Sequence, residues 1–168
     1  MTGYPRGMTD PADVRDVADE AAREVDATVD GAREAERRGD LGRWVQEFLR
    51  SPGSDNAVLG AELRSEHSSW YGPVKLPFDE LQRLAGPPDQ PTLVRLADDD
   101  IERVDDMQES MDEGWEPPPI IVSYRDGELT VEDGNHRIEG LRRAGHSEYW
   151  SVVGFEDDRD RQRFLDER

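Results

Sequence analysis

The sequence predicts an α+β protein, a small mixed sheet flanked by helices and preceded by a helical extension. In the second half of the chain, short runs of β-branched and aromatic residues alternate with segments of helical periodicity. Two of these runs are joined by Arg125-Asp126-Gly127, which is a strong hairpin signal. The first third shows only helical spacing. We therefore expect a helical N-terminal extension over residues 1–69 and a second domain over residues 70–168.

The composition narrows the classes of function. Of the 168 residues, 34% are hydrophobic and 36% are charged, which is enough for one compact core with solvated helices around it. The net charge of −19 repels nucleic acid phosphates and anionic lipid, so general nucleic acid binding is disfavoured. The absence of cysteine excludes disulfides, thiolate metal sites and thiol catalysis. Lys75 is the only lysine, which fits either a GC-rich genome or a salt-loving host.

The sequence also lacks membrane signals. It contains no apolar run of the roughly 18 residues that span a bilayer. The segment Met1–Asp10 has no apolar stretch of the kind found in a signal peptide. We expect a cytoplasmic protein that does not bind membranes.

The N-terminal extension is predicted to hold three helices, at Pro11–Arg38, Leu41–Arg50 and Asn56–Arg64. The apolar stripe of the first is made of alanine and valine, so it buries little area. Trp44, Phe48 and Leu49 in the second are the expected docking contacts. These helices are a candidate surface for a protein partner or for self-association.

The second half is predicted to alternate between strands and helices. We expect strands at Val74–Pro77, Thr92–Leu96, Ile120–Tyr124, Glu128–Glu132 and Tyr149–Phe155, and helices at Phe78–Ala85, Ile101–Met111, Asn135–Ala144 and Glu156–Asp166. Asp98-Asp99-Asp100 is interpreted as the acidic start of a helix rather than a metal site.

The turn Asp133-Gly134-Asn135-His136-Arg137 carries the most chemistry. It follows the hairpin and opens a helix, whose first N–H groups and positive dipole end favour an anion. Gly134 lets the backbone approach a ligand closely. Arg137, expected to be exposed in the first turn, can form two hydrogen bonds to a phosphate, and His136 can donate one. Asp133, with Glu132, can hold Mg²⁺ that arrives with a nucleotide.

This arrangement resembles the ParB/sulfiredoxin superfamily. The resemblance is carried by Pro118–Val122, by Gly127 and, most specifically, by Val131–Gly145, while Val74–Leu81 is similar to the opening strand and helix of the family. It covers about 95 residues, counted from the sequence. It implies a small mixed-sheet domain that binds a nucleotide with the helix-opening turn. Family members use that turn for CTP-driven DNA clamping, ATP-dependent sulfinic acid repair, nucleic acid cleavage or free-serine phosphorylation.

The chain departs from several of these patterns. Sulfiredoxins place a cysteine where this sequence has Asn135, so sulfinic acid reduction is excluded. Partitioning proteins add a helix-turn-helix and a dimerisation segment, which we do not expect in this chain. The Asp-Gly-x-His-Arg form is closer to the small kinase-like members, in which an acidic residue near the first strand is the base. The resemblance gives that role to Asp79 or Glu80, and we choose Glu80.

Three functions therefore remain open. The first is a Mg²⁺-dependent phosphotransferase or nucleotide hydrolase that uses ATP, ADP or CTP. In it Glu80 and Asp133 would be catalytic, Asp133 would bind the metal, and Gly134, Asn135, His136 and Arg137 would hold the nucleotide. The second is a non-catalytic nucleotide-sensing module with residues 11–64 as its output arm. The third is a nuclease, which the acidic surface disfavours.

Overall fold

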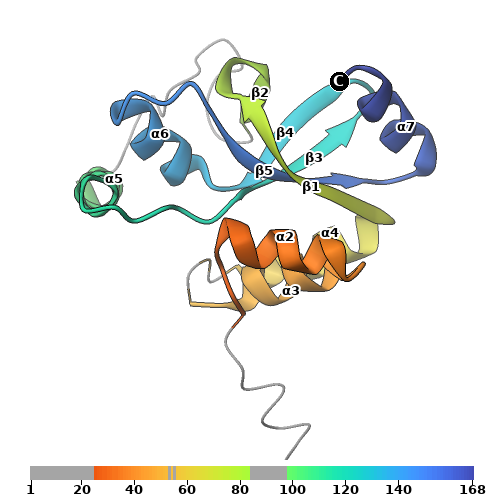
Figure 1. Ribbon diagram of the computed structural model, residues 1–168, viewed down its shortest axis with the longest axis horizontal. Helices are drawn as coiled ribbons and strands as arrows, with labels where there is room; N and C mark the ends of the chain where they lie inside the picture. Colours follow the sequence, from red (N-terminus) through yellow and green to blue (C-terminus); the bar gives the residue numbers. More distant parts are fainter. Residues whose placement is uncertain (1–24, 53, 55, 84–97) are drawn as a thin grey trace, which may run out of the picture.

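A five-stranded mixed sheet forms the centre of the protein (Figure 1). The computed structural model describes residues 25–52, 54, 56–83 and 98–168. The strands lie in the order β1-β5-β3-β4-β2. Their bounds are β1 Ser69–Pro77, β2 Leu81–Arg83, β3 Ile120–Arg125, β4 Glu128–Asp133 and β5 Glu148–Phe155. The predicted α+β fold class is confirmed.

The sheet contains both kinds of strand pairing. β5 is antiparallel to β1 and parallel to β3, while β4 is antiparallel to β3 and parallel to β2. The β3–β4 hairpin closes through Asp126 and Gly127, whose φ angles are 50° and 85°. Positive φ at both central residues is the turn that an Asp-Gly pair favours, so this prediction is confirmed.

The described part of the chain contains six α-helices, of which α5 packs against α6 and the others lie on the two faces of the sheet (Figure 1). Their bounds are α2 Val29–Arg37, α3 Leu41–Arg50, α4 Ala57–Glu66, α5 Asp98–Asp112, α6 Asn135–Arg143 and α7 Asp158–Asp166. Helices α2–α4 form a layer on one side of the sheet, and α6 and α7 lie on the other (Figure 1). None of the described helices is long and apolar enough to span a bilayer.

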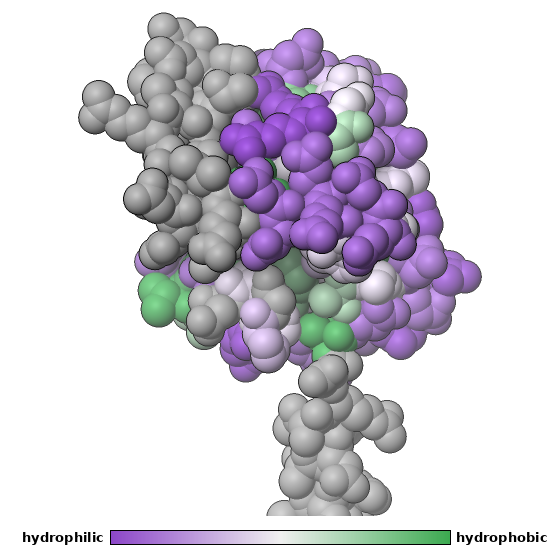
Figure 2. Space-filling model, turned by 90° about the vertical axis from the view of Figure 1, so that its left-hand side faces the viewer, coloured by the Kyte–Doolittle hydropathy of each residue, from purple (hydrophilic) through white to green (hydrophobic). Residues whose placement is uncertain are grey.

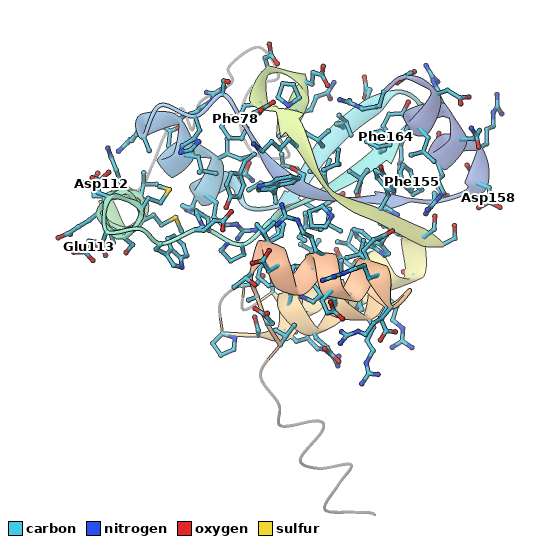
Figure 3. All side chains as sticks on the ribbon, in the orientation of Figure 1. Phe78, Asp112, Glu113, Phe155, Asp158 and Phe164 are labelled. Atoms are coloured by element: carbon cyan, nitrogen blue, oxygen red, sulfur yellow. The ribbon has the colours of Figure 1, made fainter. Side chains whose placement is uncertain are left out.

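Alternating strand residues divide the core into two apolar clusters. On β3, Ile120 and Val122 face the cluster shared with α6 and α7, whereas Ile121 faces the cluster formed mainly by α2–α4. In the first cluster, the rings of Phe155 and Phe164 lie 5.5 Å apart and join β5 to α7 (Figure 3). The described surface on the α5 side of the molecule is mostly hydrophilic (Figure 2), as the net charge of −19 leads one to expect.

The predicted helix over Pro11–Arg38 is confirmed over Val29–Arg37, but it is wrong for residues 25–28, which are not helical. Helix α2 begins at Val29, where the Thr28 hydroxyl accepts a hydrogen bond from the Gly31 amide (3.0 Å). The Asp26 carbonyl accepts from the indole of Trp44 (2.8 Å) instead of a helical amide. The Thr28 cap and the bond to the Trp44 indole stop the helix from extending backwards. The rest of the predicted helix lies outside the described residues.

The predicted helix over Phe78–Ala85 is also wrong. A single 3₁₀ turn at Phe78–Glu80 leads directly into β2, whose Leu81 pairs with Leu129 of β4. Pairing satisfies the outer edge of β4, a long-range gain that outweighs the weak local helical pattern. The first strand begins five residues earlier than predicted, and the predicted strand Thr92–Leu96 lies outside the described residues.

The remaining predicted helices and strands are confirmed within three residues of their expected bounds. The three aspartates at 98–100, expected at a helix start, are the first three residues of α5.

The division between residues 69 and 70 stays a prediction. Helices α2–α4 share an apolar cluster with Ile121 and Val152 of the sheet. The larger cluster, which includes Phe155 and Phe164, draws almost entirely on residues after Ser69.

We expect a fragment that starts at Trp70 to keep the sheet but to lose solubility. Removing α2–α4 would leave the larger cluster in place and uncover Ile121 and Val152. Near-ultraviolet circular dichroism and amide proton dispersion would measure packing, and ultracentrifugation would measure self-association. A wholly unfolded fragment would show that residues before 70 belong to the same folding unit and that the boundary is misplaced.

Candidate functional site

The turn after β4 positions the start of α6 at the end of the sheet. Gly134 is the N-cap of α6, and the first bond within the helix runs from the Ile138 amide to the Gly134 carbonyl (2.9 Å). The amides of residues 135–137 therefore have no acceptor within the helix. Together with the positive end of the helix dipole, they give this turn the electrostatics of an anion site.

Gly134 is required at this position for two reasons. Its φ of +120° lies in a region that L side chains rarely adopt. A Cβ atom would also lie 2.9 Å from Cδ1 of Ile120 and 3.0 Å from Nη2 of Arg137. The chain thus turns directly against the side chains of Ile120 and Arg137, which leave no space for a side chain at position 134.

Arg137 is buried, so the expectation of an exposed first-turn arginine is wrong. Its residue exposure is 6%, and Nη2 donates to the Pro119 carbonyl (2.9 Å) and to Oδ2 of Asp133 (3.1 Å). The guanidinium also lies over the ring of Phe48 in α3, 5.4 Å from its centroid. Nε has no hydrogen-bond partner among the described residues. Arg137 therefore supports the turn from inside the protein.

An irregularity in the hairpin explains why the two acids before Gly134 are both engaged with protein groups. Ile121 pairs with Asp133 and Val122 pairs with Val131, so Glu132 is an extra residue on β4. The Glu132 carboxyl is hydrogen-bonded to the side chain of Ser123, and burial raises its pKa above the ordinary value. Asp133 pairs instead with Arg137.

Ser123 also contacts His67, a pairing that the sequence did not indicate. The Ser123 hydroxyl lies 2.6 Å from Nε2 of His67, and both side chains are buried. Desolvation lowers the pKa of His67, which favours the neutral ring. The two residues are 56 positions apart, so no local pattern could have joined them. The half-buried Glu132 and the buried Ser123 and His67 thus form a chain of polar side chains at the end of α4.

Asn135 and His136 lie in the first turn of α6 and are half-buried. Each already takes part in an interaction within the protein. A ligand at this turn would therefore add to or exchange with existing contacts.

The described residues near the turn offer few ligands to a metal ion. No group of three His, Cys, Asp or Glu side chains that could hold a metal occurs in the described ranges. Asp133, the predicted Mg²⁺ ligand, has a side-chain exposure of 14% and is paired with Arg137. Mg²⁺ would have to draw its other ligands from nucleotide phosphates and water.

Glu80, the predicted base, is not brought to this turn. Its carboxylate pairs with Arg168 at 2.8 Å. The next residue, Leu81, pairs with Leu129 near the start of β4, whereas Asp133 ends that strand. Asp133 lies four residue steps along the strand from Leu129, or about 13 Å at about 3.3 Å per step.

Arg137→Ala should lower the free energy of unfolding by about 3–5 kcal/mol, because it leaves Asp133 buried without its cation. Arg43→Ala is the matched control, because Arg43 forms an ion pair with a residue four positions away, Glu47, and both side chains are exposed. Its loss should be at most about 1 kcal/mol. Urea unfolding followed by tryptophan fluorescence measures both variants. Equal stability of Arg137→Ala and the wild type would refute the supporting role of Arg137.

No family model and no curated protein matches the chain. Among solved structures, it is similar to the C-terminally truncated chromosome-partitioning protein ParB from Caulobacter crescentus complexed with CTP-γ-S. The two share 24% identity over 55% of this chain and 48% of that chain, with a TM-score of 0.33. This chain thus matches about half of that ParB chain.

Proposed function

We propose that the start of α6 binds the phosphate groups of a nucleotide. The observation that carries this proposal is the turn at Gly134. Its φ is +120°, and the side chains of Ile120 and Arg137 leave no space there for a Cβ atom. This turn lets α6 begin directly after β4, which places the amides of residues 135–137 at the positive end of a helix.

The charge of α6 supports the proposal. The chain as a whole has a net charge of −19, but α6 has three arginines and one glutamate. By contrast, α5 has six aspartates and two glutamates against one arginine. Arg142 and Arg143 lie in the last turn of α6, so the cation at the proposed site is Arg137 in the first turn.

The roles within the turn follow from burial. The first-turn amides of α6 and the His136 ring would contact phosphate, and Asn135 would stabilise the helix start. Arg137 would hold the turn in place and contribute its charge from beneath. If Mg²⁺ enters with the nucleotide and is bound through Asp133, the ion pair between Asp133 and Arg137 has to loosen.

The proposal concerns binding rather than turnover. The acidic groups nearest the turn are engaged with the protein, Glu132 with Ser123 and Asp133 with Arg137. Glu80 lies toward the other end of β4.

One contact favours a sensing role as the second candidate. Arg137 touches both the turn and Phe48, and Phe48 is buried in the cluster that joins α3 to the sheet. A ligand that shifts the turn would therefore act directly on the helical layer. Under this hypothesis, residues in α2–α4 change their environment when a nucleotide binds.

Calorimetry with ATP, ADP, CTP and GTP in the presence of Mg²⁺ tests the binding site. His136→Ala should weaken binding by about two- to tenfold, the effect of losing one hydrogen bond worth about 0.5–1.5 kcal/mol. The matched control is His146→Ala, an exposed histidine just beyond the far end of the same helix, which should bind like the wild type. If none of the four nucleotides binds, or if both variants lose affinity equally, the proposed site is wrong.

A further inference from the structure

Trp115 presents an unusual surface feature just after the end of α5. It is 43% exposed, and with Val58 it is one of two large apolar side chains that are exposed in the described part of the chain. Scattered apolar residues on a surface need no explanation. Trp115 differs from a scattered apolar residue in its surroundings. Hydrogen bonds hold its backbone, its side chain lines two surface hollows, and acidic residues border those hollows.

The backbone on both sides of Trp115 is held by hydrogen bonds. Its amide donates to the Ser110 carbonyl (2.9 Å), and the Gly114 amide donates to the Met111 carbonyl (3.0 Å), which together form a Schellman cap. Two residues later, the Pro117 carbonyl accepts from the hydroxyl of Tyr149 (2.6 Å). The exposed indole is therefore carried by an ordered segment, and little conformational entropy is lost when a partner covers it.

Trp115 lines two hollows in the protein surface. One has a volume of about 490 Å³ and is lined in part by Met111, Tyr149 and Trp150. The other has a volume of about 450 Å³ and is lined in part by Met107. Methionine side chains adapt to the shape of a partner, and tryptophan is enriched among residues that dominate binding energy. The surface suits an apolar side chain inserted beside the indole.

The rim of these hollows is acidic. Asp106 and Glu113 line one hollow, and Glu116 and Glu148 line the other. Lys75 lies 5.1 Å from the centroid of the Trp150 ring and is the one lysine of the chain.

The end of α5 also carries negative charge where a helix disfavours it. The last turn of α5 has no basic residue, although the carbonyl end of a helix favours cations. The side chains of Asp112 and Glu113 point away from the body of the protein (Figure 3). A cationic partner would relieve this repulsion.

We propose that this Trp115 surface docks a basic peptide segment of a partner protein, in which arginine or lysine residues flank one apolar side chain. The apolar side chain enters a hollow beside Trp115, and the flanking cations meet the acids of the rim and of the α5 terminus. The same acids repel nucleic acid and anionic lipid. Because Gly145 and His146 at the far end of α6 line the first hollow, this surface is separate from the phosphate site.

Fluorescence anisotropy of labelled peptides on the full chain tests the proposal. One probe is the peptide Arg-Lys-Leu-Phe-Lys-Arg, and the control peptide Arg-Lys-Gly-Ser-Lys-Arg has the same charge without the apolar residues. Salt at about 150 mM, where the Debye length is about 8 Å, limits binding by long-range charge alone. Trp115→Ala removes the anchor, and Val58→Ala is the matched control at the other exposed apolar residue.

We expect the apolar-containing peptide to bind the wild type about tenfold or more tightly than the control peptide, and Trp115→Ala to abolish this preference while Val58→Ala keeps it. Replacing Asp112 and Glu113 with their amides should weaken binding of the apolar-containing peptide more than Glu128→Gln with Asp158→Asn near α7. Equal binding of the two peptides, or an unchanged preference in Trp115→Ala, would overturn the proposal. Self-association of the protein that Trp115→Ala removes would also overturn it, because the occupant would then be a second copy of this chain.

Discussion

The buried guanidinium of Arg137 is the contact on which the candidate site depends. It joins the end of β4 through Asp133, the segment before β3 through the Pro119 carbonyl, and α3 through the ring of Phe48. A buried cation is tolerated only where a counter-ion and hydrogen bonds compensate its desolvation. Gly134 makes this arrangement possible, because a Cβ atom there would lie 3.0 Å from Nη2. The same group thus fixes the turn and fills the space under it.

The sheet supplies the rest of the arrangement. The irregular pairing at Ile121 and Val122 leaves Glu132 as an extra residue, so Asp133 meets Arg137 while Glu132 meets Ser123. Helix α6 follows the end of β4 directly, so its amide end lies at the turn. The helix carries three arginines on a protein whose net charge is −19. An anion at this turn would lie near the guanidinium of Arg137, which is already charged and is held in place by Pro119 and Asp133. A charge that is fixed before the ligand arrives is the condition for preorganised electrostatic recognition.

Local signals made part of the fold predictable. The Asp126-Gly127 pair specifies its own turn, and the hairpin and α6 were therefore predicted within one residue. The start of α2 and the strand β2 depend on partners distant in sequence, the indole of Trp44 and the edge of β4, and the local pattern pointed to helices instead. The burial of Arg137 was missed for a similar reason. Its position in the first turn suggested exposure, while Phe48, 89 positions earlier, covers it.

The central claim is that a nucleotide phosphate binds at the amide end of α6, and amide chemical shifts test it most directly. In a titration of the isotopically labelled chain with CTP or ATP and Mg²⁺, the account predicts that the largest saturable shifts occur at Gly134, Asn135 and His136. Phe48 should follow at the same ligand concentration, because Arg137 links it to the turn. Absence of saturable shifts, or shifts confined to residues away from α6, would contradict the account.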